Sequence, residues 1–370
     1  MLFTTIVFFC ILSILVLVHE FGHFFVARKN GVAVEEFGLG FPPRIFGIKK
    51  GETIYSINWI PLGGFCKIKG ENGDDKEGTD SFGSKKVWQR ALILAAGVLM
   101  NFILAAVLLA IGFVVGMPEA INGEDMGSAK IKDAKIEIVQ ILEGSPAGNA
   151  GLAPGDAILS IDGQKIEQIA GIQEYIDTKI NNPIKIIVSR EGAELEKEVT
   201  PIVLEETGRG GVGIGLLKSG IVSYPWYIAP WKGLEGAVFF TKEIVLAFYE
   251  LLKNLIITQK VSVDLSGPVG IAVLTGQVAR MGFVYVLQFT ALLSLNLAVI
   301  NFLPFPALDG GRILFLIIEK IRRKPVSQKI ENIVHNVGFL LLMCLVVLIT
   351  YRDIAKFGYG FVGLWNKIIG

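Results

Sequence analysis

Four apolar segments decide what this chain of 370 residues can fold into. Each is long enough for an α-helix that crosses a bilayer, which takes about 20 residues. Charged residues make up only 19% of the chain, whereas soluble domains average about 25%. The net charge of +1 gives no basic surface for nucleic acid. The sequence predicts a polytopic α-helical membrane protein whose transmembrane helices lie at residues 2–27, 91–117, 282–303 and 334–351.

The first apolar segment ends in the string His19-Glu20-Phe21-Gly22-His23. Two histidines four residues apart lie on one face of a helix, one turn above each other. This spacing suits two ligands of a tetrahedral zinc, with the adjacent glutamate as a general base. Histidine and glutamate are costly inside a bilayer and are usually functional there. The motif therefore predicts zinc-dependent hydrolysis within the membrane.

Two histidines leave a catalytic zinc one protein ligand short, because such sites usually have three. Asp309 is the favoured candidate, since an aspartate at the end of an apolar segment is costly unless it binds something. Pro304 and Pro306 stop a regular helix just before it, and broken backbone at membrane depth is tolerated where protein or water satisfies it. His335 is the other candidate, although its place beside a basic loop is typical of an interfacial histidine. The alternative for Asp309 is a plain helix-end aspartate before a glycine turn.

The basic loops predict how the helices are oriented. Lysines and arginines gather between the first two spans and between the last two, so both loops are expected to be cytoplasmic. Both termini and residues 118–280 then lie outside, and Asp309 reaches the same side as the two histidines. This holds only if a fifth apolar segment, 234–256, does not cross. Its charged residues and the aromatic residues before it favour a helix in the membrane interface.

Residues 135–204 have the pattern of a small α+β domain. Strand-like runs at 136–142, 157–161, 184–189 and 195–203 accompany one helical segment at 169–179. The string Gly151-Leu152-Ala153-Pro154-Gly155-Asp156, followed by a strand and Asp162-Gly163, resembles a PDZ domain of the bacterial protease type. PDZ domains add a peptide strand to a sheet edge. A domain of this kind with no ligand is the alternative, and 208–215 is predicted to be a glycine-rich linker.

The two motifs and the domain between them resemble the site-2 protease family of intramembrane zinc metalloproteases. The motifs are HEFGH in the first span and NFLPFPALDGG at 301–311. The arrangement is most similar to the bacterial RseP and RasP type, which cleaves anti-sigma factors. Further matching segments are 38–41, 61–65 and 266–271, and the resemblance covers essentially the whole chain. One departure is that some members carry two PDZ domains, whereas this chain has room for one.

The resemblance implies roles for individual residues. It implies zinc bound by His19, His23 and Asp309, and Glu20 as the general base that takes a proton from the attacking water. It places Asn301, Pro304 and Pro306 near the substrate. Residues 53–69, with Gly64 and Phe65, match a membrane-associated β-hairpin whose turn is predicted at 61–64 and whose edge could pair with an unwound substrate; a purely structural hairpin is the alternative. In the PDZ domain, the predicted ligand loop contains Gly151, Leu152 and Gly155.

These expectations divide the chain into four parts. Residues 1–117 would hold the first two transmembrane helices and the hairpin, 128–206 the PDZ domain, 207–280 the linker and interfacial helix, and 281–370 the last two transmembrane helices. The resemblance implies the bacterial inner membrane, with the PDZ domain on its extracytoplasmic side.

The expected partners are the lipid bilayer and single-span membrane proteins, either similar to anti-sigma factors or remnants of signal peptides, and no nucleic acid. A membrane zinc transporter and a non-catalytic PDZ scaffold are the competing functions. The glutamate beside the paired histidines argues against both.

Overall fold

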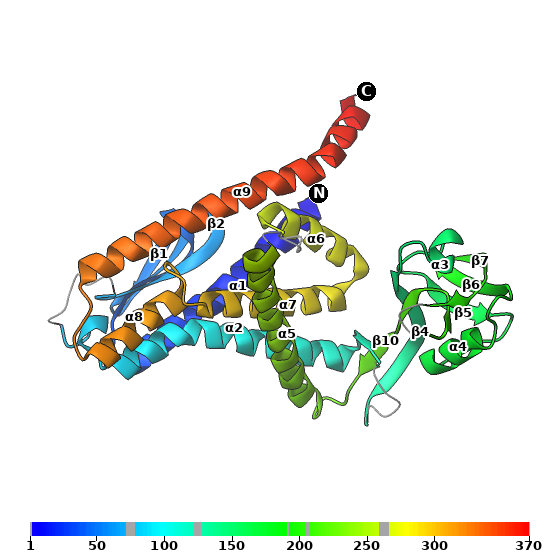
Figure 1. Cartoon of the computed structure of the whole chain (residues 1–370). Coiled ribbons are helices and arrows are strands. Elements are labelled where there is room, and N and C mark those ends of the chain that lie inside the picture. The colour runs from blue at the N-terminus through cyan, green and yellow to red at the C-terminus, as the bar shows by residue number, and fades with distance from the viewer. Residues whose placement is uncertain are drawn as a thin grey trace. The chain divides into compact units, whose positions relative to one another are not determined.

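The computed structural model describes residues 2–71, 78–121, 127–190, 192–204, 208–258 and 266–369. The chain divides into two compact units, Met1–Ile111 with Pro230–Gly370, and Gly112–Ala229. The first unit is built mainly from α1 (Leu2–Lys29), β1 (Val34–Lys50), β2 (Thr53–Ile68), the short 3-10 helix η1 (Phe82–Ser84), α2 (Val87–Val115), α5 (Ala229–Thr258), α6 (Pro268–Met281), α7 (Phe283–Phe302), α8 (Asp309–Arg322) and α9 (Gln328–Ile369) (Figure 1).

Four helices of the described chain are long and apolar enough to cross a membrane. They are Phe3–Lys29, Val87–Val115, Phe283–Phe302 and Gln328–Lys356. These are the four segments that the sequence predicts as spans, with ends that differ from the predicted ones by one to six residues. The helix expected in the interface, 234–256, lies within α5 and is not among these candidates. Its place in the interface stays a prediction.

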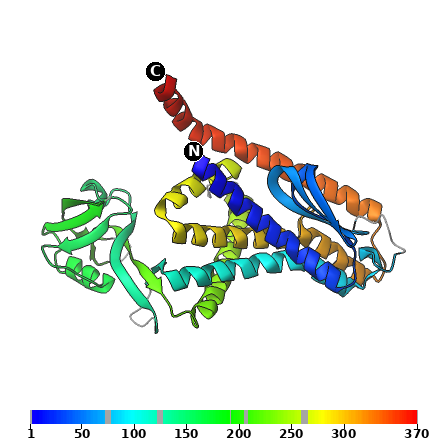
Figure 2. The same cartoon turned by 180° about the vertical axis from the view of Figure 1, so that it is seen from behind.

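The first unit packs its helices at close range. A core of α1, the β1–β2 pair, η1, α2 and α8 contains Ala27, Val34, Ile68, Phe82, Ile93 and Leu316. A Cβ on Gly22 of α1 would lie 2.4 Å from the backbone carbonyl oxygen of Ala96 in α2. Small residues permit such a close approach. Helices in a membrane associate through this close packing, because the surrounding lipid is as apolar as the helices and the hydrophobic effect does not drive them together. α6 packs against α1, α7 and α9 (Figure 2).

β1 and β2 pair along their length and lie beside α1 (Figures 1 and 2). The turn between them falls at Gly51 and Glu52, because Lys50 lies opposite Thr53 and Gly51 supplies the positive φ of +65°. Residues 61–64, where a turn is predicted, lie within β2 and do not connect the two strands. β2 itself folds back between Ile57 and Gly64, because both of these residues lie opposite Leu39 of β1. The turn predicted at 61–64 falls within this reversal.

The second unit is a six-stranded antiparallel sheet with two helices. Its strands follow the order β3 (Met117–Ala120), β10 (Ile214–Ser223), β4 (Lys130–Ile141), β5 (Ala157–Ile161), β6 (Ile184–Arg190) and β7 (Ala193–Val199). The helices are α3 (Pro146–Asn149) and α4 (Ile169–Asp177), and β8 (Ile202–Val203) pairs with β9 (Gly210–Gly211).

The core of this unit contains every second side chain of the first part of β6. Ile184, Ile186 and Val188 are fully buried and pack with Ile172 of α4. Each such side chain contributes roughly 1.5–3 kcal/mol when buried. Because β10 lies between β3 and β4, the sheet continues to Ser223, beyond the predicted range 128–206. Residues 208–215, predicted to be a linker, supply β9 and the start of β10.

Candidate metal centre

The histidines of the first motif lie where helical spacing predicts. α1 continues unbroken past them to Lys29, so His19 and His23 lie one above the other, and each is only 7% exposed. Their Nε2 atoms are 3.2 Å apart. The two rings therefore present one nitrogen each to the same point.

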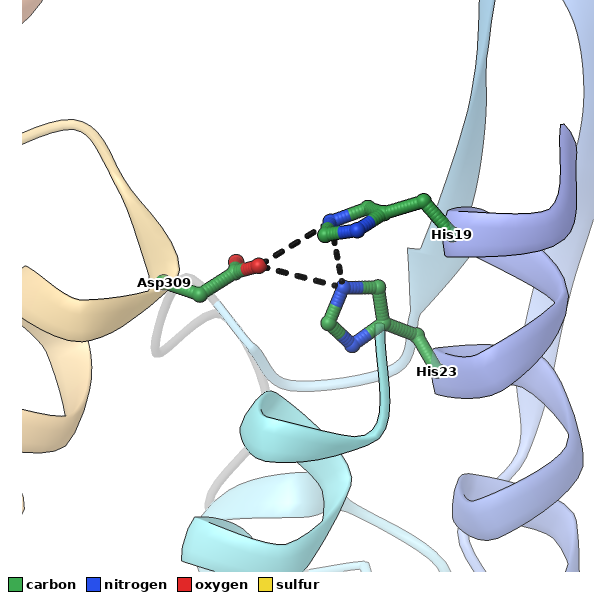
Figure 3. Close-up of side chains that lie close together, drawn as sticks. All are labelled: His19, His23 and Asp309. Atoms are coloured by element: carbon green, nitrogen blue, oxygen red, sulfur yellow. Dashed lines mark hydrogen bonds and ion pairs between the residues drawn. The ribbon is translucent and has the colours of Figure 1, made fainter. Parts of the chain in front are cut away.

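Asp309 reaches this point from the far end of the chain. α7 ends at Phe302 and α8 begins at Asp309, and the segment between them holds the two prolines of the second motif. The Oδ2 atom of Asp309 lies 3.0 Å from the Nε2 atom of His19 and 3.4 Å from that of His23 (Figure 3). A Cβ on Gly310 would lie 2.2 Å from the carbonyl oxygen of Leu303, so only glycine fits the turn behind the aspartate.

The three side chains fit a zinc ion. One ligand atom from each of His19, His23 and Asp309 lies within 4.8 Å of the others. Ligand atoms that share a tetrahedral zinc at about 2.0–2.2 Å lie about 3.3 Å from one another. Apart from the two histidine rings, the buried Oδ2 atom of Asp309 has no hydrogen-bond partner among the described residues. Two imidazoles and a carboxylate are a donor set typical of catalytic zinc.

A cavity of about 390 Å³ opens beside these ligands. Glu20 lines it with His19 and Asp309, and so do Asn301 of α7 and Gly64 of β2. The Nδ2 atom of Asn301 lies 3.5 Å from the Nε2 atom of His19. The structure thus brings five residues of the predicted site to one cavity, from three separate parts of the sequence.

Three other residues expected near the substrate lie elsewhere. The ring of Phe65 packs over Gly38, where a Cβ would meet it at 2.6 Å. Pro304 lines a separate, apolar cavity of about 1110 Å³ between α1, α2, α5 and α7. Pro306 packs against Gly338 of α9, where a Cβ would lie 2.4 Å from it. These three side chains contact the protein around the site and do not line the cavity beside the metal ligands.

His335, the other candidate for the third ligand, binds the loop before Asp309. Its Nδ1 atom accepts a hydrogen bond of 2.9 Å from the backbone N–H of Ala307. Ala307 has a positive φ of 76°, which is uncommon for a residue with a Cβ. His335 therefore holds the turn that carries the aspartate, while Asp309 lies against the two histidines.

Sequence reasoning missed the contribution of α2. The Nδ1 atom of His23 lies 2.8 Å from the carbonyl oxygen of Ile93, and the Nδ1 atom of His19 lies 3.2 Å from the side-chain amide of Asn101. A polar amide inside an apolar span was the signal, because such residues are costly in a membrane and mark functional sites. The contact through Ile93 could not be predicted in this way, because every residue has a backbone carbonyl.

The loop predicted to bind a peptide in the second unit is closed by bonds within the domain. The backbone N–H groups of Gly151, Leu152 and Gly155 donate to the carbonyl oxygens of Gly148, Ala147 and Ile138. Leu152 is also part of the domain core. With their N–H groups already used, these residues hold the domain's own fold rather than present free donors to a ligand.

Known proteins match this chain over nearly its whole length. The profile of peptidase family M50 covers residues 7–345. The chain belongs to this family. A candidate zinc metalloprotease of Clostridium perfringens is 38% identical over 92% of this chain and 96% of its own length. The regulator of sigma-W protease RasP of Bacillus subtilis is 31% identical, over 95% of this chain and 98% of its own.

Family M50 contains the site-2 proteases, so the resemblance drawn from the two motifs is confirmed. The protein is an enzyme, a zinc metalloprotease, and its four apolar helices agree with a membrane protein. A part of the chain is similar to the PDZ domain of an SdrC-like protein from Listeria monocytogenes, at 23% identity and a TM-score of 0.22, covering 24% of this chain and 92% of that one.

Proposed function

We propose that this M50 peptidase cleaves the transmembrane segments of single-span membrane proteins, with its chemistry at His19, Glu20, His23 and Asp309. The observation that carries the proposal is the convergence of two histidines of α1 and an aspartate of α8 beside a cavity that Glu20 lines. Two of these residues lie in an apolar helix long enough to span a bilayer.

His19, His23 and Asp309 would hold the zinc ion. The metal supplies a Lewis acid that polarises the substrate carbonyl and favours deprotonation of water near neutral pH. Glu20 takes the proton from the attacking water and passes it to the leaving amine. Asn301, beside His19, is in position to hydrogen-bond the substrate backbone and hold the peptide at the cavity.

Substrate positioning is assigned to the edge of β2. A helical substrate hides its peptide bonds in its own hydrogen bonds, so it has to unwind before it is cut. Among the described strand pairings, Gly64 has Leu39 as a partner, whereas Ile57 has both Leu39 and Phe46, so Gly64 lies at an edge. Gly64 also lines the cavity with Glu20. An extended substrate could add to this edge by β-augmentation, which would bring its backbone to the metal ligands.

The apolar surface of the hairpin supports its contact with lipid. Phe46, Ile48, Ile57 and Trp59 are each more than half exposed. A soluble protein rarely exposes so many large apolar side chains together. We assign this surface to the membrane, where it would place the edge at Gly64 near the hydrocarbon.

We assign the second unit to the extracytoplasmic side as a PDZ domain that selects substrates. Two modes are compatible with that place: capture of a newly exposed carboxyl end, or exclusion of substrates with bulky outer domains. Single-span proteins similar to anti-sigma factors are the proposed substrates. The name of the Bacillus subtilis relative, a regulator of sigma-W, supports this class.

Reconstitution of the full chain with a single-span reporter tests the proposal. Glu20→Gln should keep its zinc and lose cleavage by about 10²–10⁴-fold, the contribution typical of a general acid–base. Glu250→Gln, an exposed position on α5, is the matched control and should cleave normally. Wild-type cleavage by the Glu20→Gln protein would refute the role of Glu20.

A further inference from the structure

One face of α2 lies against both histidines of the metal centre. Ile93, Gly97 and Asn101 are spaced four residues apart, so they lie one above another on the helix. Ile93 and Asn101 are fully buried. Nothing else on this helix touches the ring nitrogens among the described contacts.

Gly97 lets α2 come this close. A Cβ at this position would lie 2.4 Å from the Nε2 atom of His23 and 2.8 Å from that of His19. No side chain tolerates such contacts with two rings that packing already holds in place. The absence of a side chain at Gly97 therefore leaves the space in which the two Nε2 atoms converge.

The carbonyl of Ile93 fixes the tautomer of His23. A carbonyl oxygen can only accept, so the Nδ1 atom of His23, 2.8 Å away, has to carry the proton. In the neutral ring, the Nε2 atom then keeps a free lone pair. This is the form that binds a metal through Nε2, and metal-bound histidines almost always donate their other N–H in this way.

His19 needs the same arrangement, and Asn101 is its neighbour. The amide nitrogen of Asn101 faces the Nδ1 atom of His19 at 3.2 Å, while the amide oxygen is buried without a partner among the described residues. If the Oδ1 and Nδ2 atoms of Asn101 exchange places, one of the two still has no partner among the described residues. Counting hydrogen bonds therefore does not decide which of them faces His19. A donor facing Nδ1 would place the ring proton on Nε2 and block metal binding; an acceptor would do the reverse.

We propose that the face of Ile93, Gly97 and Asn101 is the outer shell of the metal centre, and that Asn101 turns its Oδ1 atom to the Nδ1–H group of His19. The inference rests on the proposed zinc site and deepens it. Asn101 is a positioning residue, since it acts through His19. Its backbone is itself held, because the hydroxyl of Ser294 in α7 donates a buried hydrogen bond of 2.8 Å to its carbonyl oxygen.

The test is the zinc affinity of the full chain in detergent, measured by competition with a chromophoric chelator. Asn101→Leu removes the acceptor at similar size, and Asn101→Asp keeps it. Asn296→Leu is the matched control, because this second intramembrane asparagine donates to the carbonyl of Leu292 in its own helix. We expect Asn101→Leu to bind zinc about 10–100-fold more weakly, the usual loss for an outer-shell partner. Asn101→Asp and Asn296→Leu should stay within a few-fold of the wild type.

Rescue by aspartate separates an acceptor from a packing role. If the leucine and aspartate variants are equally weak while both unfold at the wild-type temperature without metal, the inference is overturned. It is also overturned if Asn101→Leu binds zinc as tightly as the control. Should the leucine variant fail to fold, Asn101→Ala takes its place in the same comparison. A wild type that binds no zinc would remove the proposed metal site itself, whereas a zinc-binding wild type with an indifferent Asn101 would remove only this inference.

Discussion

At the scale of single residues, the helical spacing of the histidines and the free-energy cost of a carboxylate in the membrane predicted the metal ligands. The residues around these ligands are selected by tertiary contacts. His19 and His23 were predictable because four residues make one helical turn. Asp309 was predictable because a carboxylate at membrane depth is expensive. The carbonyl of Ile93 was not, since every residue has one and only the packing of α2 on α1 selects it. Pro306 and Phe65 were expected at the substrate, yet the structure gives them packing contacts.

Removing the carboxylate of Asp309 should weaken zinc binding. Asp309→Ala leaves two imidazoles, so we expect its zinc affinity to fall by more than the 10–100-fold of an outer-shell change. Zinc content after dialysis against a chelator measures this loss. His335→Ala is the comparison, because His335 holds the neighbouring loop through Ala307. It should retain more zinc than Asp309→Ala; the reverse order would favour His335 as the ligand.

A methyl group at position 97 should also displace the metal. Gly97→Ala would place a Cβ within 2.4 Å of the Nε2 atom of His23, so one ring has to move. We expect loss of zinc and of reporter cleavage together. Leu99→Ala, on an exposed part of the same helix, serves as the control. Normal zinc content in Gly97→Ala would show that the rings and α2 lie farther apart than described.

At the scale of elements, long periodic segments were predictable and short ones were not. The four apolar spans and the strand 157–161 agree with α1, α2, α7, α9 and β5. α6 and α8 were missed because each has only 14 residues and depends on tertiary packing. The reversal of β2 at the Pro-Leu-Gly-Gly string was predicted, whereas the turn at Gly51 that joins β1 to β2 was missed. Residues 208–215 were predicted to be a linker because glycines weaken the strand pattern, although they supply β9 and the start of β10, which the sheet pairs on both sides.

The second unit should lose stability in acid through one ion pair. Arg190 donates two hydrogen bonds to the fully buried carboxylate of Asp156 and holds its pKa below the usual range, with further help from the N–H of Ala153. The pair therefore stabilises the fold fully above the unfolded pKa of about 3.9, and this stabilisation is lost as the pH falls through the lower folded pKa. Hydrogen exchange of the β5 and β6 amides, corrected for intrinsic rates, measures the loss.

Arg190→Leu should remove this acid dependence. It leaves the carboxylate buried and short of donors, which costs roughly 1–3 kcal/mol at neutral pH. Lys185→Gln breaks an exposed pair with Glu196 and should change the stability far less, because solvent screens exposed ion pairs. Equal effects of the two substitutions would contradict the assigned role of Asp156.

At the scale of the whole molecule, the site requires that α1 and the start of α8 meet at the same depth. The helices that cross the bilayer between α1 and α8 bring Asp309 to the side of the histidines only if α5 stays in the interface. α5 is not among the four candidate spans of the described chain. The proposed topology then puts the β1–β2 pair and α8 on the cytoplasmic side, and the second unit outside.

Single cysteines at exposed positions can map this topology. Lys49→Cys in β1 and Arg322→Cys in α8 should react with a membrane-impermeant reagent from the cytoplasmic side, after the native cysteines are replaced. Lys165→Cys in the second unit should react from the opposite side. Labelling of positions 49 and 322 from opposite sides would mean that α5 crosses and that the metal ligands cannot meet as described.

The position of the scissile bond tests the central claim most directly. The full chain is reconstituted in vesicles with a single-span substrate, and the products are sequenced by mass spectrometry. Metal ligands in α1, an apolar candidate span, predict a cut inside the substrate's apolar segment that disappears in Glu20→Gln. A cut confined to the soluble flanks, or one that persists in Glu20→Gln, would contradict an intramembrane protease built on this centre.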